Sequence, residues 1–531
     1  MRGQRQKRLN VTPALPFDRR EFLRRSLRGS ALAAGAFTAA SLFEASSSAA
    51  RSDVAASVPL SEWRRLGASL EGHLVLPSTP GYATRVLLYN SKFAKLRPAA
   101  IAYCAGSNDV ARCVDFVAKH DLDVAARSGG HSYGGYSSSR GLVIDVSRLS
   151  LITLNLPQRT AKIGAGARLI DIYNALGRHG LVLPGGSCPS VGIAGLVLGG
   201  GVGVFSRKLG LTSDHLRATR LVTAGAEQIR ASHDQHADLF WALRGGGGGN
   251  FGVNTSFEFD LAPMPKVTLF SLEYPWAAAA EVLEGWQHWL ADRPNDLWSN
   301  LHLFSQGTAG LLVQVSGVFC GTAHDLESHL RVLRRDVGAP TSSFVGADAY
   351  LEAMMIEAGC SQLSVVACHV AGEQPGGVLG HEAYSATSSY VHSPDSSARA
   401  SQWVRAVEVL QREAPFLGGG LAFDAYGGEV NRIAKADTAF VHRDKLCGVQ
   451  ATYSWGANSS PAQVAAGSTW LSWLGSRVFE SRAGAYQNYI DPTLHDWQSA
   501  YYGTNLTKLI NVKSAYDPQN LFTFPQSLPV R

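Results

Sequence analysis

One histidine in this sequence stands among four glycines, in the stretch RSGGHSYGGYS at residues 127–137. A histidine ring can bind a metal, carry a proton or form a bond to a ligand. Glycines let backbone N–H groups close on an anion such as a phosphate. His131 is therefore a candidate for chemistry, although a lone histidine in a glycine-rich turn is more often a hydrogen-bonded structural residue.

A second candidate is Cys188, in the glycine-rich stretch GGSCPSVGIAGLVLGGGVGVFSRKLGLTSDHL at residues 185–216. Taken alone, a cysteine there would be a small buried hydrophobic residue. The seven cysteines form no CxxC pair and no Cys/His spacing that would predict a metal site. We therefore expect no metal, and the odd number of cysteines leaves at least one without a disulfide partner.

Two further glycine clusters, GGGVG at 199–203 and RGGGGGNFG at 244–252, partly match the dinucleotide-binding pattern GxGxxG. Neither cluster follows a strand and opens a long helix with an acidic residue about twenty positions on, as a Rossmann fold requires. The clusters favour phosphate binding by loops of a different fold.

The elements that must position these residues begin with a predicted βαβ unit. Residues 97–106 and 122–130 are typical of strands, and residues 107–121 place apolar side chains on one helical face. Further strands are predicted at 141–149 and 161–167, and a helix at 168–180. Residues 185–216 are too rich in glycine for a regular element and too apolar for a linker.

Pro263 and Pro265 mark a domain boundary. The part from 266 to 465 alternates strands, such as 297–306 and 311–321, with helices, such as 325–337 and 397–414. This pattern predicts an antiparallel sheet covered by helices. The tail after residue 484 is dense in aromatic side chains, which predicts that it packs against the rest of the protein.

The N-terminus predicts an export signal. Residues 1–28 hold nine Lys or Arg against two acids, including the pair Arg19-Arg20, and a short apolar run and small residues follow. This resembles a twin-arginine signal, which exports folded and often cofactor-loaded proteins through its own machinery, to the periplasm or beyond. We expect cleavage near Ala50, with no stable membrane anchoring, since the apolar run is short.

The rest of the chain is electrically balanced. From Arg51 onward there are 39 basic and 39 acidic residues. The basic character of the whole chain therefore gives no reason to expect a nucleic-acid partner.

Together, 127–137, 185–216, DLFWALRGGGGGNFG and YYGTNLTKLINVKSAYDPQNLF resemble the berberine bridge enzyme-like family of FAD-linked oxidases, in the vanillyl-alcohol oxidase (PCMH-type) fold group. The matches fall within about 98–260 and 484–526, and between them only the region around 424–444 is similar. The resemblance implies a bacterial α+β flavoprotein. Its expected parts are a signal peptide (1–50), an extension (51–95), an FAD-binding domain (96–265), a substrate-binding domain (266–465) and a segment that completes the FAD domain (466–531).

The resemblance also implies doubly attached FAD, bound through His131 to the flavin 8α-methyl carbon and through Cys188 to flavin C6. Two such bonds would raise the flavin potential and leave an open cleft for substrate. Beside these two, the expected cofactor-binding residues are Arg127, Ser128, Gly129, Gly130, Ser132, Tyr133, Val191, Gly192, Gly195, Gly199, Gly200, Gly201, Gly203, Gly252, Val253, Tyr502 and Asn505. The small Val191 matches a position associated with oxygen access.

By the same resemblance, the catalytic base is Tyr489 or, as second choice, Tyr486, and Gln450 lies near the substrate. A tyrosine with its ordinary pKa near 10 is a poor base, so we expect a nearby cation or hydrogen bond to lower the pKa. Each tyrosine could instead be a packed aromatic residue.

The expected reaction is oxidation of an alcohol or sugar hemiacetal by hydride transfer to flavin N5, with O2 reduced to H2O2. Two alternatives stay open: a tailoring oxidase of a secondary metabolite, and a secreted flavoprotein without turnover.

Overall fold

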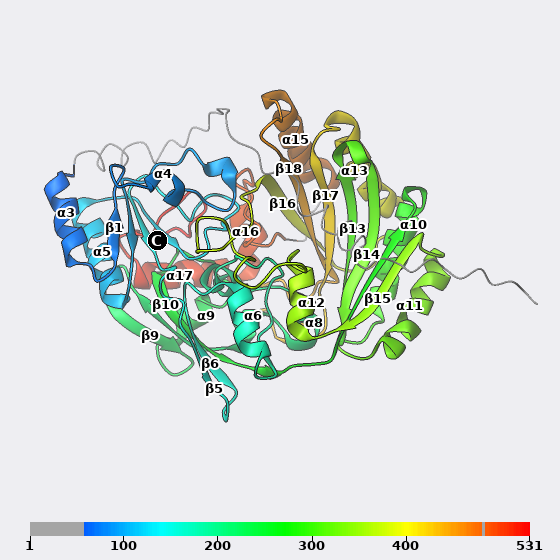
Figure 1. The fold of residues 1–531 in the computed structure, drawn as a ribbon, viewed down its shortest axis with the longest axis horizontal. Coiled ribbons are helices and arrows are strands. Elements are labelled where there is room, and N and C mark those ends of the chain that lie inside the picture. Colours follow the sequence, from blue (N-terminus) through cyan, green and yellow to red (C-terminus); the bar gives the residue numbers. More distant parts are fainter. Residues whose placement is uncertain (1–57, 480–483) are drawn as a thin grey trace, which may run out of the picture.

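The computed structural model describes residues 58–479 and 484–531 (Figure 1). The predicted export signal lies outside these residues. The described strands form sheets of four, five and seven strands and one two-stranded pair. Within the described ranges, no helix has the length and hydropathy needed to cross a bilayer, and no group of His, Cys, Asp and Glu could hold a metal ion.

The four-stranded sheet contains the predicted βαβ unit. Strand β2 (Ala100–Tyr103), helix α5 (Ser107–His120) and strand β3 (Val124–Arg127) follow in order, and β4 (Leu142–Asp145) lies between the two strands and parallel to both. Strand β1 (His73–Val75) adds an antiparallel edge to β2.

The expected N-terminal extension is therefore part of this domain wherever it is described. Helix α3 (Leu60–Ser69) packs on α5 through buried Trp63 and Leu66. The short helices α4 (Tyr82–Arg85) and η1 (Ser91–Phe93) follow β1 and lead to β2. The reading of 51–95 as a separate segment missed the pairing of β1 with β2, since three residues carry too little pattern.

The five-stranded sheet is antiparallel, in the order β5-β6-β10-β8-β9. Its strands are β5 (Ile152–Asn155), β6 (Thr160–Gly164), β8 (Leu216–Val222), β9 (Gln228–Ser232) and β10 (Val253–Asp260). Helices α6 (Leu169–Gly177) and α9 (Ala237–Ala242) accompany it, and β7 (Leu181–Val182) pairs with β11 (Ala262–Pro263).

The glycine-rich stretch 185–216 is more regular than predicted. It contains helices α7 (Ile193–Leu198) and α8 (Ser206–Leu209) and the turn η2 (Thr212–His215). Helix α7 forms because five of its six residues, in IAGLVL, are apolar and buried. Tertiary burial outweighs the low helix propensity of the glycine here.

The seven-stranded sheet confirms the predicted antiparallel sheet, in the order β15-β12-β14-β13-β17-β18-β16. Its strands are β12 (Val267–Tyr274), β13 (Leu297–Gln306), β14 (Leu311–Phe319), β15 (Ser342–Asp348), β16 (Ala383–Val391), β17 (Gly418–Ala425) and β18 (Cys447–Trp455). Helices α10 (Ala279–Ala291), α11 (Ala323–Val337) and α13 (Ser397–Glu413) cover the face turned away from the first domain (Figure 1).

The C-terminal part of the chain divides between the two domains. Helix α15 (Pro461–Trp473) and the π-helical turn η5 (Leu474–Val478) pack on α13 of the substrate domain. Helices α16 (Trp497–Tyr502) and α17 (Leu506–Tyr516) return to the first domain, where α17 packs on α9. The returning segment therefore begins later than the expected residue 466.

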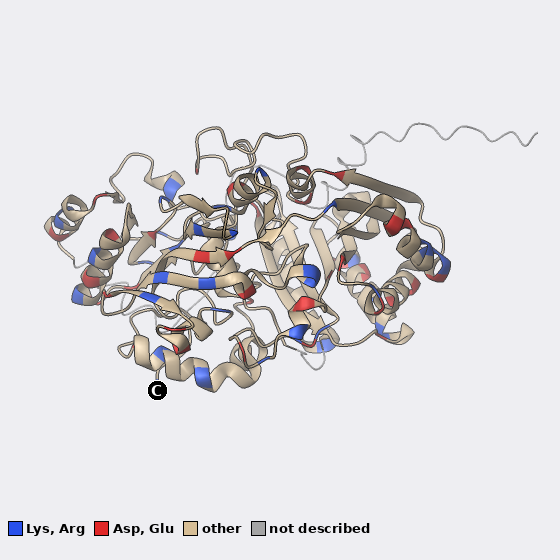
Figure 2. Ribbon diagram, turned by 90° about the horizontal axis from the view of Figure 1, so that it is seen from below, with Lys and Arg blue, Asp and Glu red and all other residues tan. Residues whose placement is uncertain are grey.

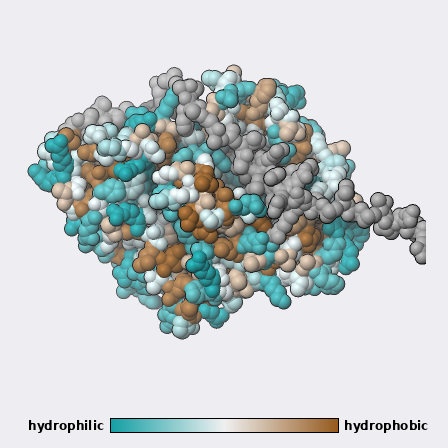
Figure 3. All heavy atoms as spheres, in the orientation of Figure 1, coloured by the Kyte–Doolittle hydropathy of each residue, from teal (hydrophilic) through white to brown (hydrophobic). Residues whose placement is uncertain are grey.

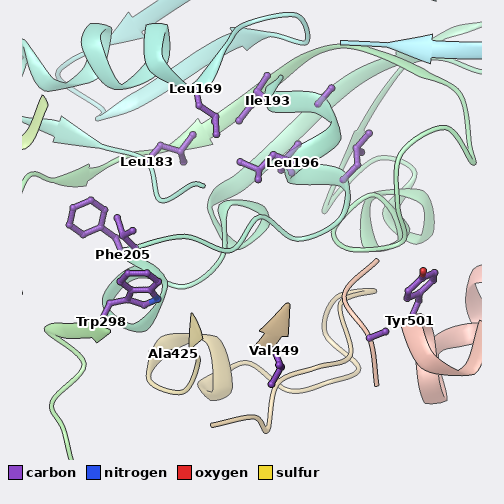
Figure 4. Close-up of a cluster of buried hydrophobic side chains, with 14 of the residues drawn as sticks. Leu169, Leu183, Ile193, Leu196, Phe205, Trp298, Ala425, Val449 and Tyr501 are labelled. Carbon is purple, nitrogen blue, oxygen red and sulfur yellow. The ribbon is translucent and has the colours of Figure 1, made fainter. Parts of the chain in front are cut away.

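Aromatic and aliphatic side chains join the three parts. Leu169 and Ile193 from the first domain, Val449 from the large sheet and Tyr501 from the tail belong to one buried cluster (Figure 4). The packing of the aromatic tail, expected from its composition, is confirmed.

The surface carries mixed charged and apolar residues (Figure 2 and Figure 3), and two of the cysteines form a disulfide. Basic and acidic residues are interspersed over the outer helices (Figure 2), and hydrophilic and hydrophobic residues are mixed on the face shown in Figure 3. Cys360 and Cys368 form a disulfide in the loop after α12 (Tyr350–Glu357), whereas Cys188 is a free thiol.

Candidate active site

A cavity of about 510 Å³ lies between the first domain and the large sheet. Its walls come from six parts of the chain: the segment at Tyr89 before β2, the loop after β3, the loop leading into α7, the glycine loop before β10, the inner face of strands β13, β16, β17 and β18, and the tail. The size and the mixed polar and apolar lining are typical of a small-molecule site.

His131 and Cys188 both line this cavity. The Nε2 atom of His131 is hydrogen-bonded to the Ser190 hydroxyl at 2.9 Å, and the ring stacks on Tyr89 with a centroid distance of 4.0 Å. Burial lowers the pKa of His131 to about 3, so the ring is neutral at physiological pH. In the described part of the chain no hydrogen bond engages Nδ1, which leaves that nitrogen available to a ligand.

The Cys188 thiol faces Tyr89 and Glu382. Burial raises the pKa of Cys188 to about 12, so the sulfur is protonated at rest. Sequence reasoning missed Tyr89 and Glu382, because nearly three hundred positions separate them and neither lies in a recognisable motif.

Close packing explains the glycines beside His131. A Cβ on Gly129 would collide with the Gly192 backbone, and a Cβ on Gly192 would collide with the Ser128 side chain. The Ser128 hydroxyl donates to the Ala165 carbonyl at 2.6 Å, which fixes the loop against the five-stranded sheet. The two glycine-rich loops therefore meet at the cavity wall.

The space beside Gly195, in helix α7, shows whether the cavity suits a large ligand. It is exposed, although its neighbours Ala194 and Leu196 in α7 are buried. A Cβ on Gly195 would meet no protein atom within 4 Å, and the residue lines the cavity. The missing side chain therefore leaves space on the cavity side of α7.

Most of the other predicted cofactor-binding residues also line the cavity. They are Arg127, Ser128, Gly129, Gly130, Ser132, Tyr133, Val191, Gly192, Gly252, Val253 and Tyr502. Arg127 is an exception in its chemistry, because its buried guanidinium forms an ion pair with Asp145 and donates to the Arg85 carbonyl. It holds the loop in place and has no free charge for a phosphate.

Five predicted cofactor-binding residues do not line the cavity: Gly199, Gly200, Gly201, Gly203 and Asn505. A Cβ on any of the four glycines would collide with neighbouring protein atoms, at Gln487, Phe440, Thr212 and Gly185 respectively. The glycines therefore serve close packing between loops. Asn505 donates to the carbonyls of Lys435 and Thr438 and so ties the tail to the loop after α14 (Glu429–Arg432).

Tyr489 lines the cavity, and its ring stacks on Tyr133 at 5.3 Å. Its hydroxyl makes no hydrogen bond to the described residues, and it is not among the polar atoms sealed from solvent. It is thus open to a substrate. The expected lowering of its pKa is wrong: burial, and then the charge of Asp424, raise the pKa of Tyr489 well above 10.

Tyr486 differs in its hydrogen bonds. Its oxygen accepts from the amides of Gly201 at 3.1 Å and Val202 at 3.4 Å, and from Asn488 Nδ2 at 2.9 Å. Burial nevertheless raises the pKa of Tyr486. With these bonds the hydroxyl anchors the glycine loop, which leaves Tyr489 as the more accessible of the two candidate bases.

Gln450 joins the two domains at the cavity. From β18 its side-chain amide donates to the Tyr133 hydroxyl at 2.8 Å. Tyr133 follows His131 in the first domain, so this bond sets the sheet against the loop that carries the histidine. Tyr133 also packs edge-on against Tyr384 of β16.

Asp424 is a site residue that sequence reasoning did not identify. It lies on β17, and burial raises its pKa to about 6. Asp424 and Tyr489 line a second cavity of about 10 Å³, roughly the space that one water needs. The signal that could have revealed it is a single acidic residue in the otherwise apolar and glycine-rich β17, next to a β18 with polar residues at every second position.

The comparisons with known proteins agree with this geometry. Residues 98–232 match the family described as FAD binding domain, and residues 485–529 match the one described as berberine and berberine like. The second match covers the returning tail, so the two halves of one domain are recognised separately.

Several relatives cover most of the chain. An uncharacterized FAD-linked oxidoreductase of Bacillus subtilis (strain 168), YgaK, is 31% identical over 87% of this chain and 97% of its own length. Glucooligosaccharide oxidase of Sarocladium strictum is 30% identical over 80% of this chain and 86% of its own length.

Two solved structures share the fold. Berberine bridge enzyme-like protein 1 of Physcomitrella patens has a TM-score of 0.79 and 28% identity, over 88% of this chain and 99% of its own. A chitooligosaccharide oxidase has a TM-score of 0.78 at the same identity and coverage. The fold is thus the predicted α+β, PCMH-type FAD-binding fold, and the protein is an FAD-linked oxidoreductase. The chain belongs to the berberine bridge enzyme-like family.

Proposed function

We propose that this protein is an oxidase of sugar hemiacetals or related alcohols, with FAD attached through both His131 and Cys188. The observation that carries this proposal is the convergence on one cavity of His131, Cys188 and the open hydroxyl of Tyr489. The free thiol of Cys188, the unengaged Nδ1 of His131 and the space beside Gly195 all fit such a cofactor.

FAD, when bound, accepts the hydride that leaves the substrate carbon. The residues of the chain then have the task of holding the substrate and taking its hydroxyl proton. Tyr489 has its hydroxyl open to the cavity, and its ring is held between Tyr133 and Tyr486. We infer that Tyr489 receives the proton.

Asp424 provides the onward destination of that proton. Because its pKa is about 6, it is largely ionised at neutral pH and can accept a proton across the small cavity that it shares with Tyr489. A buried tyrosine with a raised pKa acts as a base only if its own proton moves on as the new one arrives. The pair therefore works as a relay, in place of the phenolate expected from sequence.

The inner face of the large sheet supports a carbohydrate substrate. Gln450, Thr452 and Ser454 line the cavity from β18, and Gly418 and Gly419 of β17 lie beside them. A Cβ on Gly419 would collide with the Thr452 backbone, so glycine lets β17 and β18 pack closely here, and Phe304 of β13 adds an aromatic ring to the cavity wall. Polar side chains beside an aromatic surface suit a sugar, and two relatives are named for oligosaccharide oxidation.

A tailoring oxidase of a secondary metabolite is the second candidate. The aromatic lining from Tyr89, Tyr384 and Trp455 favours it, as does the 29% identity to tetrahydroberberine oxidase of Argemone mexicana. A peroxide-coupled screen of mono- and oligosaccharides against polycyclic alcohols separates the two. We expect O2 consumption with H2O2 release on sugars, and turnover of no sugar would contradict our preference.

The third candidate is a flavoprotein without turnover. We expect purified protein to be yellow, with the colour retained after acid denaturation. Intact mass reports cofactor attachment, and it also tests export, since we propose removal of residues 1–50 by the twin-arginine route. A flavin released by acid would contradict covalent attachment, and protein that keeps its colour but reduces O2 with neither substrate class would favour this candidate.

A further inference from the structure

Tyr89 and Glu382 have no part in the proposed turnover, yet the backbone holds them together at the cavity. The Glu382 amide donates to the Tyr89 carbonyl at 3.1 Å, and the Ser91 amide donates to the Glu382 carbonyl at 2.8 Å. The Tyr89 amide in turn donates to the Gly130 carbonyl at 3.2 Å, next to His131. These bonds therefore hold three segments that are far apart in sequence next to His131.

The side chains of this pair contact those two residues. The Tyr89 ring lies on the His131 ring at 4.0 Å, and the Tyr89 hydroxyl lies beside the Cys188 thiol and the Glu382 carboxylate. All four residues line the large cavity. A hydroxyl between a thiol and a carboxylate can take a proton from one as it gives its own to the other.

The raised pKa of Cys188 explains why its thiol needs a proton acceptor nearby. With its pKa raised to about 12 by burial, the thiol does not ionise unaided at neutral pH. Thiols react with electrophiles as thiolates. Burial also raises the pKa of Glu382, which makes it a stronger base than an ordinary carboxylate.

We propose that Tyr89 and Glu382 form the proton relay for formation of the thioether between Cys188 and the flavin ring. The inference rests on the proposed double attachment. The S–H bond breaks, its proton passes to Tyr89 while Tyr89 protonates Glu382, and the sulfur electron pair forms the S–C bond. The ring carbon loses its hydrogen as a proton to solvent. The two electrons of that C–H bond reduce the flavin, which O2 reoxidises.

Two substitutions each remove one proton-carrying group of the relay and keep the size of the side chain. Tyr89→Phe keeps the ring on His131 and lacks the hydroxyl, and Glu382→Gln keeps the backbone pairing and lacks the base. We expect each to slow thioether formation about 100-fold, in line with the usual contribution of a general base. Full-length apoprotein is incubated with FAD in air, and the flavin-bearing Cys188 and His131 peptides are quantified by mass spectrometry over time.

Tyr82→Phe is the matched control, because it removes a buried hydroxyl that donates to the Pro98 carbonyl and does not line the cavity. It should form the thioether at the wild-type rate. In a Cys188→Ala background, Tyr89→Phe and Glu382→Gln should leave the rate of the His131 attachment unchanged. That comparison separates a relay for sulfur from a general loss of folding or of FAD binding.

The pH dependence gives a second readout. The titratable groups that face Glu382 are Tyr89, Cys188, Tyr133 and Tyr384. The relay needs Glu382 ionised, so wild-type attachment should slow as the pH falls below the raised pKa of Glu382, whereas Glu382→Gln should lose this limb.

Wild-type rates of thioether formation in Tyr89→Phe or Glu382→Gln would overturn the relay, as would equal slowing of both attachments. A wild-type protein with no thioether at all would overturn the proposed double attachment together with the relay. The two failures are therefore distinguishable in one experiment.

Discussion

Burial sets the protonation of the side chains that face the cavity. His131 is held neutral, and the Cys188 thiol and the Tyr489 phenol are held protonated. Neutral groups of this kind can be packed against an uncharged ring at a much smaller desolvation cost than ionised ones. Chemistry then requires neighbours that accept protons, and Asp424 and Glu382 occupy those positions.

Replacement of Tyr489 tests the proton acceptor for the substrate. Tyr489→Phe should keep the flavin and slow its anaerobic reduction by substrate about 100-fold, because the hydroxyl that takes the proton is lost. Stopped-flow absorbance measures the rate. The control is Tyr453→Phe on β18, which loses one hydrogen bond to Ser468 behind the sheet. Equal rates in Tyr489→Phe and wild type would place the base elsewhere.

The pH profile tests Asp424. Because its folded pKa is raised to about 6, the carboxylate form increases as the pH rises through that value, and flavin reduction should speed up with it. Asp424→Asn should lose this limb and be about tenfold or more slower at neutral pH. Persistence of the limb in Asp424→Asn would assign it to another group.

At the scale of elements, helix α7 shows how a short segment shapes the site. Its buried residues anchor it to the first domain, and Gly195 leaves the side toward the cavity open. A helix made of strong helix formers would place a side chain there.

Gly195→Leu should therefore fill cofactor space without loss of the fold. Leucine favours helix by almost 1 kcal/mol over glycine, so the apoprotein should be at least as stable. Flavin content, from absorbance per protein, should fall several-fold, while the melting temperature of the apoprotein holds. Gly106→Leu, whose side chain would meet open space before α5, is the control. Full flavin content in Gly195→Leu would show that this surface does not bind the cofactor.

Elements with a strong pattern agreed closely with prediction. Strand β13 occupies the predicted 297–306, and α11 and α13 match their predicted ends within two residues, because alternation and helical periodicity extend over many positions. Helix α7 and strand β1 were missed because six and three residues hold too little periodicity.

At the scale of the whole molecule, the site exists only because distant segments meet. Tyr89 comes from the first hundred residues, Glu382 and Gln450 from the middle domain, and Tyr489 from the returning tail. The excess of basic residues lies within residues 1–28, outside the described residues, and the chain from Arg51 onward is electrically balanced.

The two-point attachment is a property of this whole assembly. His131→Ala and Cys188→Ala should each keep one covalent bond and lower both the flavin potential and the rate of turnover. The double variant should release its flavin on denaturation, because only noncovalent contacts remain. Redox titration and fluorescence of denatured gels measure these outcomes. Covalent flavin in the double variant would reveal a different attachment residue.

Local motifs of unusual composition were enough to predict the family, the FAD-linked chemistry and the candidate residues His131, Cys188, Gln450 and Tyr489. The assembled fold was needed to see which glycines line the cavity, which tyrosine hydroxyl is accessible to a substrate, and which carboxylates lie close enough to accept protons. Those properties depend on burial and on contacts between residues hundreds of positions apart, and no local pattern records them. Asp424 and the pair of Tyr89 and Glu382 therefore became visible only when the sheet, the first domain and the tail were assembled around one cavity.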